Sequence, residues 1–351
     1  MIWEKVRGHA EWIEMFRRSI RRGRLAQAYL FMGPEGVGKK LFARSLSQCL
    51  LCRRFEDVDL EACGECSCCR QMTADTHPDF HSVGVPDGKS ELPIELLAGP
   101  KEHRGREGLC YELSLRPMSA QRRIAVIDDA QLMNAESANA LLKTLEELPP
   151  DSLLILIATN AAAVLPTIRS RCQQVRFAAL PQADVADLLI GLKLTDDRSE
   201  AETLAALSGG SLTVAGQLLN PELRRLRESL YNHLAGDHFN AVAVTEKMLA
   251  GLDDIGGDAL AQRKNASWLI RFAIEFYRRA LRALAGGNEG ATIAQVQAFV
   301  DRIQPASADE LELLMELLER AALAESRLNR KTPVPICLEG LFEDLGQLSH
   351  A

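Results

Sequence analysis

The chain has 351 residues, of which 47% are hydrophobic and 25% are charged, and its formal net charge is −7. These values are ordinary for globular proteins and leave room for two or three domains with cores of their own. The negative balance argues against a protein that wraps nucleic acid over its whole surface. No apolar run approaches the length of a membrane span, and the N-terminus lacks the apolar core of a signal peptide. We therefore expect a cytoplasmic protein without a membrane partner.

The first predicted elements surround a glycine-rich stretch. Residues 1–27 show helical spacing of apolar residues, the apolar run 28–32 predicts a strand, and 41–51 predict a second helix. Between strand and helix lies GPEGVGKK at 33–40, the setting of a phosphate-binding loop, whose backbone N–H groups and lysine hold phosphates. The alternative is a glycine turn that only joins the two elements. The candidate nucleotide-binding residues of this loop are Gly33, Gly36, Gly38, Lys39 and Lys40.

The last position of the loop departs from the phosphate-loop pattern. A Ser or Thr normally follows the lysine, because its hydroxyl holds Mg²⁺. Here the residue is Lys40, which supplies no hydroxyl and adds a positive charge. A cation about 4 Å from a metal ion costs roughly 4 kcal/mol per unit charge at an effective dielectric near 20. We expect the loop's fold to be kept, and binding of ATP and Mg²⁺ to be weak or absent.

A cluster of cysteines follows the second helix. Cys63, Cys66 and Cys69 are each separated by two residues, and Cys52 lies at the end of the helix. Disulfides are rare in the cytoplasm, so this spacing favours a closed tetrahedral zinc site that is structural, not catalytic. Cys52 is the natural fourth thiolate, Cys68 could take the place of Cys69, and a set of reduced thiols without metal is the other alternative.

The middle of the chain contains a second candidate part of the nucleotide site, an acidic pair at the end of a strand. A short strand is expected at 80–85, and the Gly-, Pro- and charge-rich residues 86–108 read as a mobile surface insertion. The apolar strand 123–127 then ends in Asp128 and Asp129. In phosphate-loop proteins the first acid at such a strand end binds Mg²⁺ and the next one polarises the attacking water. An acidic pair that merely ends a strand is the alternative.

The remaining strands complete the pattern. A buried strand at 152–158 ends in Thr159-Asn160, and Asn160 is placed to sense a γ-phosphate. A last strand at 173–177 follows Ser170-Arg171-Cys172. Strands and helices that alternate to about residue 178 predict a parallel α/β sheet with a ligand at the carboxyl ends of the strands. From residue 180 onward the pattern is wholly helical.

Six stretches together resemble one known family, the bacterial clamp-loader subunits. These AAA+ proteins open a ring-shaped sliding clamp and place it on primed DNA for the replicative polymerase. The resemblance covers 28–177 in detail, and the helical remainder fits by pattern only. The matching stretches are Gly33 to Lys39, the cysteine set, His77-Pro78-Asp79, Asp128-Asp129-Ala130, NALLKTLEE at 139–147 and Ser170-Arg171-Cys172.

The resemblance implies a domain plan. Residues 1–178 would form an AAA+ phosphate-loop domain with a parallel five-stranded sheet and an inserted zinc module at 49–72. Residues 179–220 would form an all-α lid, and 221–351 an all-α C-terminal collar that mediates oligomerisation. The sequence alone does not predict a role for the insertion at 86–108.

Within this family, three positions favour the stationary delta-prime kind of subunit over the gamma/tau motor kind. A motor should have Thr or Ser at Lys40, Glu at Asp129 and a lid arginine at Thr213. We therefore expect a component of DNA polymerase III that has no polymerase activity of its own and negligible ATPase activity. The alternatives are an active gamma/tau-type motor that tolerates Lys40 and a zinc-bearing scaffold unrelated to replication.

The resemblance also implies a role for Arg171. In this family the arginine of the Ser170-Arg171-Cys172 motif points into the ATP site of the neighbouring subunit and acts there as an arginine finger. The implied partners are motor subunits (gamma/tau) and a clamp-opening delta subunit in a hetero-oligomeric ring, and through the complex the sliding clamp and primed DNA. Alternatively, Arg171 merely pairs with a nearby acid of its own chain.

Overall fold

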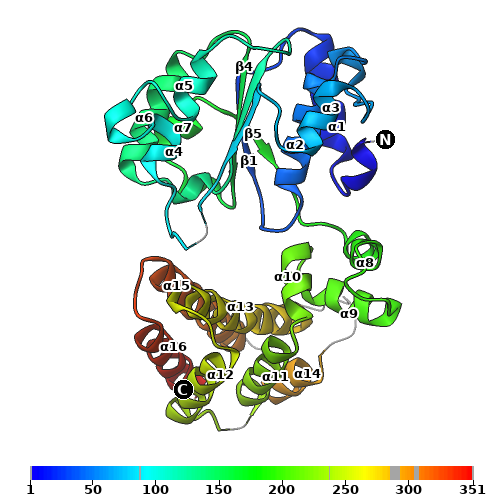
Figure 1. The fold of residues 1–351 in the computed structure, drawn as a ribbon. Helices are drawn as coiled ribbons and strands as arrows, with labels where there is room; N and C mark the ends of the chain where they lie inside the picture. Colours follow the sequence, from blue (N-terminus) through cyan, green and yellow to red (C-terminus); the bar gives the residue numbers. More distant parts are fainter. Residues whose placement is uncertain (1, 87, 237, 285–292, 304–307, 350–351) are drawn as a thin grey trace. The chain divides into compact units, whose positions relative to one another are not determined.

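The computed structural model describes residues 2–86, 88–236, 238–284, 293–303 and 308–349. The chain divides into two compact units, an N-terminal unit Met1–Ala215 and a C-terminal unit Gly216–Ala351. The helices expected for the lid thus fall largely within the first unit. Figure 1 traces both units in chain order.

A parallel sheet forms the middle of the N-terminal unit. The expected five parallel strands are confirmed, in the spatial order β2-β3-β4-β1-β5. Every residue of β1, β3 and β4 is buried, which explains why these strands read as continuous apolar runs. The strands are β1 Ala28–Met32, β2 Phe80–Val83, β3 Arg123–Ile127, β4 Ser152–Ala158 and β5 Gln173–Arg176.

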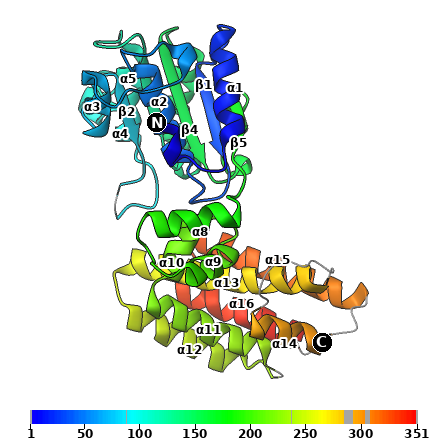
Figure 2. The same ribbon diagram turned by 90° about the vertical axis from the view of Figure 1, so that its right-hand side faces the viewer.

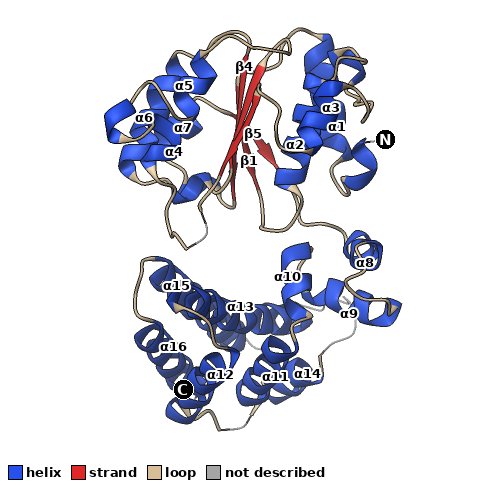
Figure 3. Ribbon diagram, in the orientation of Figure 1, coloured by secondary structure: helices blue, strands red, loops and turns tan. Residues whose placement is uncertain are grey.

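Helices cover both faces of this sheet, with α1, α2 and α3 on one side and α4 to α7 on the other (Figures 1 and 3). The helices and 3₁₀ turns of the unit are η1 Ile2–Lys5, α1 Ala10–Arg21, α2 Lys39–Leu51, η2 Asp57–Asp59, α3 Ser67–Thr73, α4 Ile94–Ala98, η3 Lys101–His103, α5 Leu109–Ser114, η4 Ala130–Leu132, α6 Ala135–Glu146, η5 Ala161–Ala163, α7 Pro166–Arg169, α8 Gln182–Gly191 and α9 Arg198–Leu207; α10 Leu212–Leu218 crosses the boundary to the second unit.

The two faces of the sheet bury different side chains. On the face of α1 and α2, Tyr29 lies 4.9 Å from Phe16 and Phe31 lies 5.8 Å from Phe42, measured between ring centroids. On the other face, Leu30 belongs to an aliphatic cluster with side chains of α4 to α7. The period of two along β1 assigns alternate residues to these two cores.

Two sequence expectations need correction. The helix expected over 1–27 is limited to α1 with the short turn η1 before it, and Gly8, with φ +74°, lies between them. The expected surface insertion at 86–108 is in part a core segment: Leu92 and Leu97 are fully buried and join the aliphatic cluster. The Gly, Pro and charged residues of the whole stretch 86–108 gave it the composition of a surface loop, although it contains these two leucines.

Asp79 fixes the entry to β2. Its side chain is fully buried and accepts hydrogen bonds from the backbone N–H groups of Met118 (2.6 Å), Ser119 (2.7 Å) and Ala120 (2.9 Å). Burial alone would raise the pKa of this carboxyl, but the backbone hydrogen bonds outweigh burial and lower the pKa. Arg123 approaches the same carboxylate to 3.6 Å. The His-Pro-Asp stretch therefore ties the loop before β3 to β2.

The C-terminal unit is all-α in its described residues, and Figure 2 shows α13 beside α15. Its first helix begins at an Asn-Pro pair, where Asn220 Oδ1 caps α11 by accepting from Glu222 N at 2.9 Å. None of the described helices combines the length and apolar character needed to cross a membrane. The helices are α11 Pro221–Ala235, α12 Ala241–Ile255, α13 Ala259–Leu284, α14 Ala294–Arg302, α15 Ala308–Asn329 and α16 Val334–Ser349.

Candidate functional site

The carboxyl ends of neighbouring strands bring the predicted nucleotide residues to one edge of the sheet. The glycine loop follows β1, Asp128 and Asp129 follow β3, and Asn160 follows β4. Since β4 pairs with both β1 and β3, these three segments lie at the same edge, where parallel sheets bind ligands.

The loop lysine is held by its own loop. The helix α2 begins at Lys39, and Gly38 before it has φ +95°, a conformation that glycine adopts without strain. Lys39 Nζ donates to the carbonyl oxygens of Gly33 (2.7 Å) and Pro34 (2.6 Å), and only 6% of the residue is exposed. Burial lowers the pKa of this ammonium, against the nearby charge of Asp128.

Lys40 contacts the carboxylate that would bind the metal ion. Its Nζ lies 3.0 Å from Asp128 Oδ2. The other carboxylate oxygen, Asp128 Oδ1, accepts from the backbone N–H of Asp129 at 3.1 Å. An ammonium group thus stands beside Asp128, where the phosphate-loop pattern has a hydroxyl and Mg²⁺. The two oxygens of Asp128 are both engaged within the chain.

The other two predicted nucleotide residues also have local partners. Asp129 lies in the left-handed region with φ +53°, and its Oδ1 accepts from Gln131 Nε2 at 3.2 Å. Burial raises the pKa of Asp129, and the neighbouring charge of Asp128 raises it further. Asn160 Oδ1 accepts from Ala162 N at 2.9 Å and caps the turn η5. The side-chain amide of Asn160 therefore caps a local turn at the carboxyl end of β4.

The start of α10 packs directly on the glycine loop. Leu212 N donates to Gly36 O at 3.0 Å. A Cβ added at Gly36, whose φ is +73°, would lie 2.5 Å from Ser211 Oγ and 2.6 Å from Thr213 Oγ1, so only glycine fits. Thr213 therefore contacts the glycine loop itself. This is the position at which a motor subunit would be expected to carry the lid arginine.

His9 also belongs to this site, although none of the sequence motifs contains it. Its ring is buried, its Nε2 lies 2.7 Å from Val37 O, and the ring packs edge-on against Phe177 at 4.8 Å. A lone histidine before a helix belongs to no motif and to no apolar stripe, so no sequence signal could have identified it. The glycine loop is therefore held by Lys39, by the start of α10 and by His9.

The four predicted metal ligands form one cluster. The Sγ atoms of Cys52, Cys63, Cys66 and Cys69 all lie within 4.8 Å of one another, and those of Cys63 and Cys69 are 3.9 Å apart. Cys68, the alternative ligand, is buried outside this group. Four thiolates at zinc–sulfur distances of about 2.3 Å require sulfur atoms about as close as these, so the donor set fits a tetrahedral zinc ion.

Backbone N–H groups point at the sulfur atoms of the cluster. Cys63 N contacts Cys52 Sγ at 3.5 Å, Cys66 N contacts Cys63 Sγ at 3.3 Å, and Cys69 N contacts Cys66 Sγ at 3.4 Å. Burial alone would raise the pKa of the Cys66 thiol, but hydrogen bonds from backbone N–H groups, led by that of Arg53, lower it to about 6. Such N–H···S contacts favour the thiolate form that binds metal.

The cysteine cluster is anchored at both ends. Cys52 is the C-cap of α2, and Cys66 is the N-cap of α3. Trp3 Nε1 donates to the carbonyl oxygen of Leu60 at 2.7 Å, which fastens the loop between the two helices to η1. A metal ion in the cluster would join α2, α3 and the loop between them.

The predicted interface arginine lies on the surface beside an acid. Arg171 Nη2 lies 2.7 Å from Glu146 Oε1, and Arg171 Nη1 donates to Thr167 O at 3.1 Å. The side chains of Arg171 and Glu146 are 39% and 54% exposed. Ser170 Oγ also donates to Thr167 O at 3.0 Å. Two hydrogen bonds that Arg171 donates to acceptors of its own chain thus orient a guanidinium that is still open to solvent.

Cys172, the third residue of the motif, points into the protein. It is buried in the aliphatic cluster, and this burial raises the pKa of its thiol to about 12. A thiol of this kind is unreactive at neutral pH. Cys172 therefore anchors the segment between α7 and β5.

The chain is similar in sequence to subunits of DNA polymerase III. A family model described as "DNA polymerase III, delta subunit" matches residues 8–181. The DNA polymerase III subunit delta' of Pseudomonas aeruginosa is 34% identical over 207 residues, which cover 59% of this chain and 60% of the relative. The delta' subunit of Bacillus subtilis is 33% identical over 178 residues, which cover 51% of this chain and 50% of the relative.

A tau/gamma subunit is also similar. The DNA polymerase III subunit tau/gamma of Haemophilus influenzae is 32% identical over 185 residues, which cover 52% of this chain and 25% of the relative. In each of these three matches the chain spans less than two thirds of the relative's own length.

Proposed function

The chain belongs to the family of DNA polymerase III clamp-loader delta' subunits, and from this premise we propose that it is a stationary, non-hydrolysing member of a clamp-loader ring. In this proposal it acts in the cytoplasm and completes a hetero-oligomeric ring with gamma/tau motor subunits and a clamp-opening delta subunit. The ring places a sliding clamp on primed DNA for the replicative polymerase. The chain itself has no polymerase activity.

The observation that carries the proposal is the contact of Lys40 with Asp128. Mg²⁺ at this carboxylate would have to displace the ammonium group, whose Nζ is 3.0 Å away. If Lys40 stayed within about 4 Å, repulsion of the divalent ion would cost roughly 8 kcal/mol at an effective dielectric near 20. If it swung into solvent, the metal ion would still lack the hydroxyl ligand that the loop normally provides.

Two further features support low ATP turnover. Thr213 packs on Gly36 and brings no positive charge to the site. Asp129 is one methylene shorter than the Glu that polarises water in motors, and an error of about 1 Å in placing a catalytic group can cost a hundredfold in rate.

The chemistry that this chain contributes is assigned to Arg171. Its planar guanidinium suits the oxygens of a γ-phosphate better than an ammonium does, and an arginine supplied in trans stabilises the charge that develops during hydrolysis. Glu146 and the carbonyl of Thr167 hold Arg171 on the surface until a neighbouring subunit presents its ATP. Exposed ion pairs of this kind are worth about 0–1 kcal/mol, so the exchange of partner is inexpensive.

We assign zinc to the cluster of Cys52, Cys63, Cys66 and Cys69 as a structural ion. Four thiolate ligands leave no open position for a substrate or a water molecule. When bound, the ion would cross-link the loop between α2 and α3, which is polar and has few apolar side chains to bury. The residues of the cluster do no chemistry in the loading reaction.

One observation favours a motor subunit as the second candidate. Lys39 and Asp128 are both present at the positions that motors use, and a tau/gamma subunit is among the similar proteins. Steady-state ATP turnover by the purified chain separates the two candidates. A rate near 1 s⁻¹ or above, the low end of ordinary enzymes, would assign the chain to the motors.

Assembly is the second test of the proposal. The chain is mixed with gamma/tau and delta subunits, and the complex is isolated by size exclusion and assayed for clamp loading on primed DNA. We expect a stable complex whose loading depends on this chain. Failure to copurify with either subunit would favour a zinc-bearing scaffold outside replication.

A further inference from the structure

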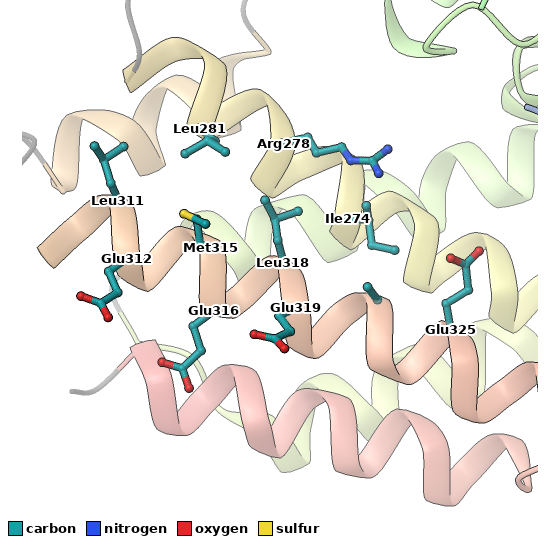
Figure 4. A pocket seen from close by; sticks show the side chains of 11 residues that line it. Ile274, Arg278, Leu281, Leu311, Glu312, Met315, Glu316, Leu318, Glu319 and Glu325 are labelled. Atoms are coloured by element: carbon teal, nitrogen blue, oxygen red, sulfur yellow. The ribbon is translucent and has the colours of Figure 1, made fainter. Parts of the chain in front are cut away.

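A groove of about 1040 Å³ lies between α13 and α15 in the C-terminal unit (Figure 4). Leu311, Met315 and Leu318 of α15 line it, and Met315 is 64% exposed. The oligomerisation expected of this unit already accounts for an exposed apolar groove. The contacts that lead away from the cysteine cluster in the N-terminal unit are different, because neither the nucleotide site nor Arg171 accounts for them.

Arg53 contacts the cysteine cluster with its backbone and a distant loop with its side chain. Its backbone N–H donates to Cys66 Sγ. Its guanidinium donates from Nε, at 3.1 Å, and also from Nη2 to the carbonyl oxygen of Ser119, which is 66 positions later in the chain. Arg53 also directly follows Cys52. One residue therefore connects two of the clustered cysteines to a segment that contains none of them.

The segment that receives this contact is the loop 115–122, which joins α5 to β3 and has neither helix nor strand structure. Asp79 accepts hydrogen bonds from the backbone N–H groups of its residues 118, 119 and 120. Arg123 Nη2 donates to Arg116 O at 3.3 Å. Tertiary contacts, and not regular secondary structure, thus determine the conformation of this loop.

A second contact joins the loop to the segment between Cys52 and Cys63. Arg122 forms an ion pair with Asp57 of η2, and the two side chains are 22% and 25% exposed. Partly buried pairs are screened by salt less than exposed pairs are. The loop is therefore held by Asp79 and Arg123 on one side, and by two residues of the cysteine segment on the other.

Both contacts from the cysteine segment require that segment to be ordered. A side chain can donate to a fixed acceptor only when its own backbone is fixed, and fixing the backbone costs conformational entropy. Four metal–sulfur bonds would meet this cost, because they hold Cys52 and Cys66 on either side of the hydrogen bond from the Arg53 backbone. Without the metal, the same cost would fall on the contacts with Ser119 and Arg122.

We propose that zinc in the cysteine cluster sets the position of the loop 115–122, and that Arg53 is the positioning residue that carries this coupling. The inference rests on the proposed assignment of zinc. Loss of the metal leaves the loop with its contacts to Asp79 and Arg123 alone. Zinc thereby controls a surface loop that includes Met118, whose exposed fraction is 76%, and does more than hold its own segment together.

The test measures hydrogen exchange of the backbone amides of residues 118–120, which donate to Asp79 and so report the position of the loop. Mass spectrometry of overlapping peptides compares the full-length chain with zinc and after a chelator has removed it. We expect zinc removal to speed exchange at residues 118–120 by at least about tenfold, with little change in the buried strands β1 and β4.

Variants identify the residue that carries the coupling. Arg53→Ala should keep zinc and speed exchange at residues 118–120 about threefold to tenfold, since it removes one hydrogen-bonded side chain. Arg53→Lys keeps one donor for Ser119 O and should restore part of the protection. The matched control is Arg54→Ala, which removes the neighbouring arginine and its exposed ion pair with Glu65. This control should leave exchange at residues 118–120 unchanged.

The double variant Arg53→Ala with Asp57→Asn removes both contacts from the cysteine segment. Exchange at residues 118–120 should then be fast with or without zinc, and the response to zinc removal should fall below about twofold. A response as large as that of the wild type would overturn the assignment of the coupling to these two residues.

Elemental analysis separates failure of the zinc assignment from failure of this inference. A chain that neither contains zinc nor takes it up would overturn both. A zinc-loaded chain in which zinc removal speeds exchange within 52–69 but not at residues 118–120 would overturn the coupling alone. So would an equal effect of Arg54→Ala, or a loss of protection that extends equally to β1 and β4, because the metal would then stabilise the whole unit.

Discussion

Replacing Arg171 by alanine separates a structural role of this side chain from a role at a neighbouring ATP site. In the structure its interactions are an exposed ion pair with Glu146 and one hydrogen bond to a carbonyl oxygen. An exposed pair contributes about 0–1 kcal/mol and the hydrogen bond about 1 kcal/mol. Arg171→Ala should therefore lower the free energy of unfolding by no more than about 2 kcal/mol and leave zinc content unchanged.

The expected effect on catalysis is much larger. An arginine finger supplied in trans is worth about 10³–10⁵ in rate, which is about 4–7 kcal/mol at 1.36 kcal/mol per tenfold. The adjacent motor site should lose this factor, while total turnover of the ring falls less because other sites keep their own arginines. The assays are steady-state ATPase and clamp loading by the reconstituted ring, with urea unfolding of the isolated variant.

Glu146→Gln is the matched control for Arg171→Ala. The amide keeps an oxygen that can accept from Arg171 but removes the charge, so stability should change by less than about 1 kcal/mol and ring ATPase by less than about threefold. If the Arg171→Ala ring assembles, loads clamps and hydrolyses ATP at the wild-type rate, Arg171 is only the ion-pair partner of Glu146, and the finger assignment is wrong.

Three other predictions concern the metal, the nucleotide site and the fold. Elemental analysis should find one zinc per chain, lost in Cys69→Ser and kept in Cys68→Ser; the reverse result would reassign the ligand. Lys40→Thr alone should leave ATP turnover of the isolated chain far below about 1 s⁻¹, because Thr213 is unchanged; motor-like turnover would contradict the delta' assignment. Asp79→Asn should cost about 2–4 kcal/mol in urea unfolding, because the amide cannot accept all of the hydrogen bonds made to the carboxylate. Since the folded pKa of this carboxyl is lowered, its stabilisation is complete above the unfolded pKa near 3.9 and is lost as pH falls through the folded pKa. The stability gap between wild type and variant should therefore close in acid, and a gap that persists would show a packing effect.

The strands and the cysteine cluster could be predicted because their signals are local. Each buried parallel strand is a continuous apolar run, and the ends of β1, β3 and β4 follow directly from those runs. Three of the four clustered cysteines have two residues between each neighbouring pair, a spacing that nearly fixes their geometry. Cys52, which lies eleven residues before Cys63, was identified only because a fourth thiolate was needed.

The contacts that define the nucleotide site could not be read from local patterns. Lys40 and Asp128 are 88 positions apart, and Thr213 lies 177 positions from Gly36, so neither contact follows from a motif. Leu92 and Leu97 are buried although the stretch 86–108 around them is rich in charge, glycine and proline, because the topology brings their segment onto the aliphatic face of the sheet. Long-range contacts of this kind depend on the whole fold.

The order of strands has a consequence for synthesis of the chain on the ribosome. β1 lies between β4 and β5 in the sheet, although it is the first strand to be made. Between the end of β1 at residue 32 and the end of β5 at residue 176 the ribosome adds 144 residues, which takes roughly 7–30 s at about 5–20 residues per second. The cysteine cluster, confined to positions 52–69, is complete much earlier.

Until β4 is completed at residue 158, the apolar strand Ala28–Met32 has neither of its neighbours. Nascent chains halted before β4 should therefore aggregate or recruit chaperones, and chains halted after β5 has left the ribosome should resist protease.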